Sequence, residues 1–249
     1  MGGNLLEIRN LVKNFGGVHA SDHLSMAVRE GETHAVIGPN GAGKTTLISQ
    51  ISGLVRPDSG EIIFDDRDLT KLPAHRRAHL GLARSFQISS VFLGLSVLDN
   101  VTLAIQAHQG HSFRFWENVR ASADLRDPAL AVLQRVSLGE RAADPAAQLS
   151  HGERRQLEFA MALATEPRML LLDEPMAGMG REEGSRILDI ITELHGTKTL
   201  LLVEHDMDVV FSLADRISVL VYGQVLATGD PQSIRGNEDV QKAYLGEIA

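Results

Sequence analysis

A glycine-rich segment near residue 40 has the residue types and spacing of a phosphate-binding loop. Residues 38–46 read Gly-Pro-Asn-Gly-Ala-Gly-Lys-Thr-Thr. Glycines let the backbone wrap closely around phosphate oxygens, and the amides of residues 41–46 can point inward as donors. Lys44 can then reach the β- and γ-phosphates of a nucleotide, and the Thr45 hydroxyl can ligate Mg²⁺. The residues expected to contact a nucleoside triphosphate are Gly38, Pro39, Asn40, Gly41, Ala42, Gly43, Lys44, Thr45 and Thr46.

Two adjacent carboxylates follow an apolar run in the second half of the chain. Residues 169–174 read Met-Leu-Leu-Leu-Asp-Glu. Ligands of open α/β sheets bind at the carboxyl ends of the strands. Asp173 is therefore expected to hold Mg²⁺ through water, and Glu174 to polarise the attacking water as a general base. Alone, the pair could equally be two solvated acids, but the phosphate loop favours catalysis.

Residues 150–153 read Ser-His-Gly-Glu and form a capping box that begins a helix. The Ser150 side chain is expected to bond forward to residue 153, and the Glu153 side chain to bond back. A capped helix N-terminus that contains a glycine is also a site for anions. The segment is thus interpreted both as a helix start and as a second contact to nucleotide phosphate.

Two further polar residues complete the candidate chemistry. His205 follows the apolar run 200–203 and Glu204, so it is placed at the end of a strand, where it can sense the γ-phosphate. Gln87, in the segment Arg84-Ser-Phe-Gln, could supply an amide oxygen to Mg²⁺. By itself a glutamine carries almost no weight, and a lone histidine is more often structural.

The elements that must position these motifs predict an α/β fold. The apolar run 34–37 before the phosphate loop predicts a buried strand, and residues 45–51 after it favour a helix. Further strands are expected at 169–172, 199–203 and 217–222 with helical stretches between them. Strands that alternate with helices indicate a core built on a parallel sheet.

The remaining segments predict two additions to this core. Short alternating runs at 5–9, 24–28 and 61–64, separated by turn residues, indicate an antiparallel piece near the N-terminus. From about residue 72 to 165 the pattern becomes helical, which predicts an inserted helical subdomain at about 88–165.

Two local patterns in the helical region carry their own expectations. Asp127-Pro128 is typical of an N-cap followed by proline in the first turn. The basic stretch 76–79, Arg-Arg-Ala-His, is expected to be a solvated helix face.

Composition narrows the classes of function. The chain has 249 residues, 43% of them hydrophobic, and no cysteine, which excludes disulfides, thiolate metal sites and thiol catalysis. The net charge of −8 argues against nucleic acid as the main partner. No apolar run reaches the roughly 18 residues of a membrane span, and residues 1–9 lack the plan of a secretion signal. A cytoplasmic protein is expected.

Together the motifs resemble those of ABC-type ATPases, in order and in approximate spacing. The resemblance covers nearly the whole chain, 1–249, and implies one ABC ATP-binding domain of the P-loop NTPase fold, with ATP and Mg²⁺ as ligands. It implies that Phe15 stacks on adenine with Val18 beside it. It also implies a head-to-tail dimer, in which Ser150 and Gly152 of one chain cover the ATP of the other.

Within that superfamily the chain resembles the ATP-binding subunits of bacterial uptake systems for branched-chain amino acids, related hydrophobic amino acids, amides or urea. Three stretches carry this resemblance: Ala177-Gly-Met179 after the acid pair, the run 88–93 after Gln87, and the C-terminal pattern 240–247. The resemblance implies a subunit that lies on the inner face of the membrane, works with permease subunits and serves a periplasmic binding protein indirectly. It implies that a permease helix docks near Phe92.

Three positions depart from the family pattern. His151 occupies the position of the first signature glycine, and Glu153 that of the usual glutamine. Gly180 stands where many relatives carry an aspartate that crosses the dimer, so no side-chain role is assigned there.

Several alternatives remain open at the level of sequence. They are an export ATPase of lipid or polysaccharide type, a soluble ABC ATPase that acts on nucleic acid or ribosomes, and a small-molecule kinase, which the 149–153 signature disfavours. The transported molecule, and a homodimer as against a heterodimer, are not determined.

Overall fold

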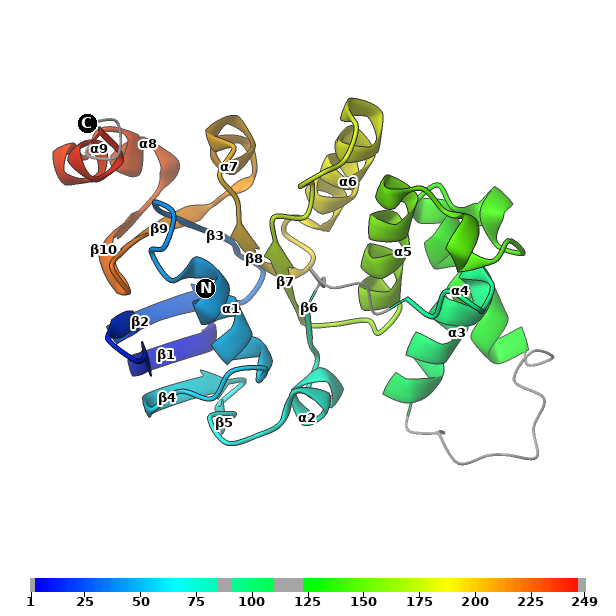
Figure 1. The fold of residues 1–249 in the computed structure, drawn as a ribbon, viewed down its shortest axis with the longest axis horizontal. Helices are drawn as coiled ribbons and strands as arrows, with labels where there is room; N and C mark the ends of the chain where they lie inside the picture. The colour runs from blue at the N-terminus through cyan, green and yellow to red at the C-terminus, as the bar shows by residue number, and fades with distance from the viewer. Residues whose placement is uncertain (1–2, 85–90, 110–122, 246–249) are drawn as a thin grey trace. The chain divides into compact units, whose positions relative to one another are not determined.

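The computed structural model describes residues 3–84, 91–109 and 123–245 (Figure 1). The chain divides into two compact units. The first unit comprises Met1–Leu82, Met169–Glu174 and His195–Ala249. The second unit comprises Ala83–Arg168 and Pro175–Leu194.

An antiparallel sheet forms the N-terminal part of the first unit. Its strand order is β2-β1-β4-β5, and the strands are β1 (Asn4–Phe15), β2 (Val18–Arg29), β4 (Ser59–Phe64) and β5 (Arg67–Asp68). β1 pairs with β2 and with β4, and its register shifts near Lys13. The predicted antiparallel piece is confirmed, with longer strands than the alternating runs suggested.

The second sheet has the strand order β10-β9-β3-β8-β7-β6. Its strands are β3 (Thr33–Ile37), β6 (Leu82–Arg84), β7 (Met169–Asp173), β8 (Thr199–Val203), β9 (Arg216–Val221) and β10 (Gln224–Gly229). β7, β8, β3 and β9 run parallel, and β10 pairs antiparallel with β9. The parallel core is confirmed, whereas β6 and β10 were not anticipated, because β6 is very short and β10 alternates between exposed and half-buried residues.

The two faces of the parallel sheet are covered by different elements (Figure 1). Val36 joins a core shared by the antiparallel sheet and by helix α1 (Lys44–Ser52). Ala35 and Ile37 point the other way, into a second core with residues of the C-terminal helices. Those helices are α7 (Met207–Leu213), α8 (Pro231–Arg235) and α9 (Glu238–Leu245).

The basic stretch in helix α2 (Ala74–His79) corrects one expectation. Arg77 is 1% exposed, so it does not belong to a solvated face. Its guanidinium donates to the carbonyls of Gln50 and Ile51, both at 2.7 Å, in the last turn of α1. A helix C-terminus leaves carbonyl oxygens without intrahelical partners and favours positive charge there. Arg77 is therefore buried because it caps α1.

Helices dominate the second unit. They are α3 (Val97–His108), α4 (Ala123–Arg135), α5 (His151–Leu163) and α6 (Arg181–Leu194). α5 packs against α3, α4 and α6. The expected start of a helix at Asp127 is wrong, because α4 already begins at Ala123 and Pro128 lies inside it. Proline at this position removes the hydrogen bond that residue 128 would otherwise donate to the Asp124 carbonyl, and α4 nevertheless extends to Arg135.

Membrane-spanning segments are absent from the part of the chain that the structure describes: none of its helices has both the length and the apolar character needed.

Candidate functional site

The glycine-rich loop lies between β3 and α1, in the strand–loop–helix context that its sequence predicts. Gly38 and Gly43 both have positive φ, at 150° and 103°. A Cβ at Gly38 would collide with the Leu220 carbonyl oxygen, and a Cβ at Gly43 with that of Ala20. At both positions glycine is needed because the backbone of neighbouring strands approaches the loop.

Lys44 begins α1 and turns its side chain back over the loop. Its Nζ atom donates to the carbonyl oxygens of Gly38 at 2.5 Å and Pro39 at 2.9 Å. The N–H groups of the first turn of α1 lack intrahelical partners, and the helix dipole favours negative charge at this end. A Cβ atom at Gly41 would have no atom of another part of the chain within 4 Å, so there is space beside this residue. The loop therefore fits a chain of phosphate groups.

The acid pair lies where the parallel strand β7 ends. Asp173 is its last residue and is 2% exposed. Glu174 follows with a φ of 46°, and its N–H donates to the Val203 carbonyl at the end of β8. A positive φ at a glutamate is uncommon, and such strained residues cluster at functional sites.

His205 lies next to the acid pair, as the strand-end placement predicts. Its Nδ1 atom is 3.7 Å from Glu174 Oε1 and 3.8 Å from Glu204 Oε2. The side chains of His205 and Glu174 are 72% and 36% exposed, whereas that of Glu204 is 4% exposed. An imidazole thus stands between two carboxylates, and neither contact is a close hydrogen bond.

Glu204 is a residue that the sequence interpretation missed. Burial raises the pKa of this carboxyl; the N–H group and charge of His205 oppose the rise, and the charge of Glu174 adds to it. Its Oε2 atom accepts from the His205 N–H at 3.2 Å. The sequence feature that could have identified Glu204 is its position between the apolar run 200–203 and His205.

Phe15 and Val18 flank the turn between β1 and β2 and are 50% and 63% exposed. Val18 and Gly41 line one cavity of about 600 Å³, which brings this turn next to the phosphate loop. Tyr222, at 84% exposure, lines the same cavity and had no predicted role. The neighbourhood of Val18 and the loop agrees with a base and ribose bound beside the phosphates.

The capping box at the start of α5 is confirmed. Glu153 N donates to Ser150 Oγ at 3.1 Å, and Ser150 N donates to Glu153 Oε2 at 2.8 Å. Arg141 Nη1 lies 2.7 Å from the other Glu153 oxygen. Glu153 therefore closes the box and joins it to the preceding segment, a role that a carboxylate fills well.

His151 and Gly180, which both depart from the family pattern, have neighbours within the second unit. The His151 ring lies beside Gly178, where a Cβ would be 3.3 Å from His151 Cε1. Gly152 lies against the Glu183 carboxylate, which accepts from the Gly180 N–H at 3.0 Å. The loop after the acid pair thus accommodates the bulk of His151 through a glycine.

Two remaining expectations concern the metal. Gln87 lies outside the described residues. Among the residues that are described, no cluster of three or more His, Asp or Glu side chains could hold a metal ion by itself. Mg²⁺ is commonly bound through one or two protein oxygens together with substrate phosphates and water. Thr45 at the start of α1 and Asp173 at the end of β7 fit that kind of site.

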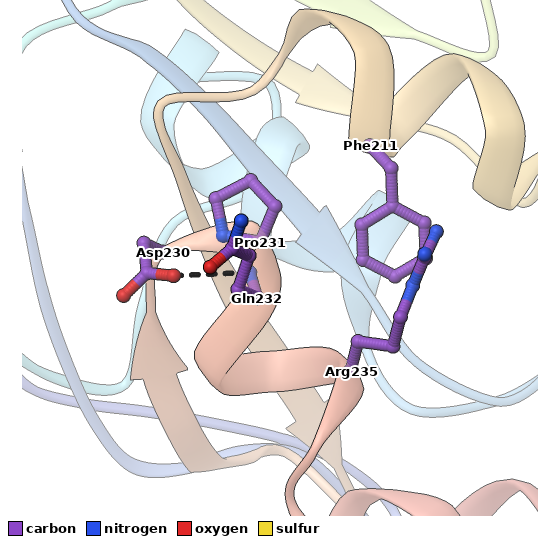
Figure 2. A pocket seen from close by; sticks show the side chains of 5 residues that line it. All are labelled: Phe211, Asp230, Pro231, Gln232 and Arg235. Carbon is purple, nitrogen blue, oxygen red and sulfur yellow. Dashed lines mark hydrogen bonds between the residues drawn. The ribbon is translucent and has the colours of Figure 1, made fainter.

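A second hollow, of about 420 Å³, lies between α7 and α8 (Figure 2). The guanidinium carbon of Arg235 is 4.3 Å from the centroid of the Phe211 ring. Asp230 Oδ1 accepts from the N–H groups of Gln232 and Ser233, so this carboxylate caps α8. None of the predicted chemistry falls here.

Comparison with known proteins decides the family. The family profile described as ABC transporter matches residues 21–177. The chain belongs to the ABC transporter family. A second profile, described as branched-chain amino acid ATP-binding cassette transporter, matches residues 224–249 of the cassette. The cassette is 38% identical, over 98% of both chains, to the high-affinity branched-chain amino acid transport ATP-binding protein LivG of Salmonella typhimurium.

Solved structures resemble the cassette over nearly its full length. An ATP-binding cassette of an ABC transporter in its ADP conformation has a TM-score of 0.83 and 29% identity, covering 98% of this chain and 99% of its own. A dimeric post-hydrolysis cassette bound to ADP and phosphate has a TM-score of 0.78 and 25% identity, covering 91% of this chain and 98% of its own. The predicted ABC-type fold is confirmed.

Proposed function

We propose that the cassette binds and hydrolyses ATP as the energising subunit of a membrane importer for branched-chain or other hydrophobic amino acids. The observation that carries this proposal is the shared edge of one parallel sheet. The phosphate loop follows β3, the acid pair ends β7, and His205 follows β8. Full-length similarity to LivG, and the second profile at residues 224–249, support the class of cargo.

Each residue of this edge has a part in hydrolysis. The loop amides and Lys44 hold the β- and γ-phosphates, and the half-buried Glu174 takes a proton from the attacking water. His205, whose Nδ1 is 3.7 Å from Glu174, is placed to contact the γ-phosphate. Thr45, Asp173 and Gln87 are the proposed holders of Mg²⁺, which neutralises phosphate charge when bound.

The second half of the nucleotide site comes from another cassette. In a head-to-tail dimer, the N-terminus of α5 presents Ser150, His151, Gly152 and Glu153 to the partner's ATP. Ser150 is the N-cap and Gly152 lies in the first turn of a thirteen-residue helix, whose dipole favours an anion at this end. The dimeric cassette with ADP and phosphate supports this arrangement, with either an identical or a different partner chain.

Coupling to the permease uses the segment before α3. Phe92 and Leu93 are 57% and 44% exposed, whereas Val91 is buried. The buried Asn100 side chain holds this segment: it accepts from the Phe92 N–H at 2.8 Å and donates to the Phe92 carbonyl at 3.1 Å. Two exposed apolar side chains on a firmly held backbone suit a permease helix on the inner face of the membrane.

Reconstitution with the permease subunits tests the proposal. We expect phosphate release and uptake of labelled leucine, isoleucine or valine when the cognate binding protein is added. Phe92→Ala should keep nucleotide affinity and lose transport-coupled ATPase activity, while Leu54→Ala, also at an exposed apolar residue, should keep coupling. Outward transport of a lipid, or labelled phosphate on a metabolite, would contradict the proposal. Unchanged uptake by Phe92→Ala would contradict only the docking segment.

A further inference from the structure

The aromatic ring proposed to stack on the base has one face already covered. Phe15 is the last residue of β1 and is half exposed. The ammonium group of Lys13 lies 5.3 Å from the centroid of the Phe15 ring. A cation at this distance over a ring face is attracted by the ring quadrupole. A planar base therefore has the opposite face of Phe15 available to it.

Lys13 is held in this position by Asp58, which lies in the turn before β4. The Lys13 Nζ atom is 2.7 Å from Asp58 Oδ1. Only 17% of the Lys13 side chain is exposed, although it belongs to a residue type that normally extends into water. The ion pair therefore fixes a long side chain that would otherwise sample many rotamers.

The same acid also holds the backbone that leads to Phe15. Asp58 Oδ2 accepts from the Asn14 N–H at 2.7 Å, and the Asp58 N–H donates to the Val12 carbonyl at 2.8 Å. Three successive residues of β1 are thus tied to one aspartate. These ties occur where the register of β1 with β2 shifts, so the regular sheet ladder is interrupted there.

The charge state of the acid suits this role. Hydrogen bonds from the Lys13 ammonium and the Asn14 N–H hold the pKa of the Asp58 carboxyl below its ordinary value. The carboxylate is therefore ionised at neutral pH.

We propose that Asp58 and Lys13 are positioning residues for the nucleotide base. Asp58 fixes the end of β1, and Lys13 closes one face of Phe15, so the ring presents its other face to a purine. This inference rests on the proposed function, because it requires that ATP bind beside this turn. It adds two residues that themselves touch no phosphate.

Binding of ATP and of inorganic tripolyphosphate separates base recognition from phosphate recognition. Lys13→Met and Asp58→Asn should each raise the Kd for ATP by about threefold to tenfold, because a less firmly held Phe15 ring loses part of its stacking on the base. The Kd for tripolyphosphate should stay unchanged. In hydrolysis, KM should rise while kcat stays the same, because the contact between the base and the Phe15 ring is made equally in the ground state and the transition state.

A matched control is present on the same strand. Glu7 and Arg9 of β1 form an exposed ion pair of 2.6 Å, and Glu7→Gln removes it without touching the turn that carries Phe15. This variant should bind ATP as the wild type does. In the background of Phe15→Ala, which itself weakens ATP binding, Lys13→Met should have no further effect.

The outcomes distinguish this inference from the proposed function. Asp58→Asn and Lys13→Met with wild-type ATP affinity, beside a weakened Phe15→Ala, would overturn the positioning role alone. Equal weakening of ATP and tripolyphosphate binding would also overturn it, because that result indicates a general loss of structure. A wild-type protein that binds tripolyphosphate and ATP equally well would overturn both the positioning role and the base site.

Discussion

Two pairs of histidine and glutamate lie at opposite ends of the same parallel sheet, and they differ in the burial of the histidine and in the distance between its ring and the acid. At the amino ends of the strands, His34 is fully buried and its Nδ1 is 2.5 Å from Glu32 Oε1. Its Nε2 is 2.8 Å from Ser218 Oγ. At the carboxyl ends, His205 is exposed and lies 3.7 Å and 3.8 Å from its two acids.

The pKa values of the buried acids shift in opposite directions. Burial alone would raise the pKa of Glu32, but the hydrogen bond and charge of His34 and the charge of Arg216 lower it overall. Burial raises the pKa of Glu204, and the opposing interactions with His205 do not overcome it. The pair at the amino ends is satisfied and stabilises the fold. At the carboxyl ends, Glu204 accepts a backbone N–H of His205, while the His205 ring makes no close side-chain hydrogen bond to either acid.

The largest effect on activity should come from Glu174, the half-buried acid at the carboxyl ends. Glu174→Gln should lower phosphate release by about 10²–10⁴-fold, the range for loss of a general base, and should accumulate the ATP-bound dimer. Phosphate release and size-exclusion chromatography with ATP measure the two results. Glu61→Gln, at an exposed position on β4, is the control. Rapid turnover by Glu174→Gln would remove the proposed base.

Loss of His205 should lower activity, but by less than loss of Glu174. His205→Ala should lower phosphate release by about 10²-fold, as loss of one preorganised contact to developing charge does. Its melting temperature should stay near that of the wild type because the side chain is 72% exposed. His205→Ala with full activity would remove the proposed γ-phosphate contact.

The converse holds at the amino ends of the strands. Glu32→Ala should lower the free energy of unfolding by about 2–4 kcal/mol, because it leaves His34 and Arg216 without their buried carboxylate partner. Urea denaturation measures this loss. The folded fraction should hydrolyse ATP at the wild-type rate, and a selective loss of kcat would show that this end also serves catalysis.

The smallest effect is a difference in pH dependence. The pKa of Glu32 is lowered in the fold, so its stabilisation is present above 4.5 and is lost as pH falls through the folded pKa. The pKa of Glu204 is raised, so its charged form costs stability increasingly as pH rises above 4.5. Glu204→Gln should therefore gain about 1 kcal/mol or less near neutral pH, and nothing in acid, in urea titrations. Glu32→Gln should lose stability near neutral pH and less in acid. If the free energy of unfolding of Glu204→Gln and Glu32→Gln depended on pH in the same way, the opposite pKa shifts of the two acids would be contradicted.

Sequence patterns located the strand ends well, because each depends on a short apolar run followed by polar residues. The runs before Gly38, Asp173 and His205 all proved to be strands of one sheet. The same reasoning misjudged Pro128 and Arg77. α4 extends on both sides of Pro128, although proline is typical of the first turn of a helix. Arg77 is buried because its guanidinium donates to carbonyl oxygens of α1, which lie far from it in the sequence.

The sequence predicted which motifs belong to the candidate site, but it did not predict which side chains contact one another there. Nothing in the spacing of Lys13, Phe15 and Asp58 indicates that they meet, because a turn 45 residues away supplies the acid. Glu204 has the same limitation, since its burial depends on packing around the end of β8.

The sequence by itself determined the parts that a few consecutive residues can encode. These are the phosphate loop at Gly38–Thr46, the capping box at Ser150 and the carboxylates at the end of β7, since local backbone geometry and hydrogen bonding specify each one. Only the tertiary structure decided that His34 is buried against its glutamate and that His205 is exposed beside Glu204. That decision depends on desolvation, which is set by residues far apart in the chain, and no local pattern records it.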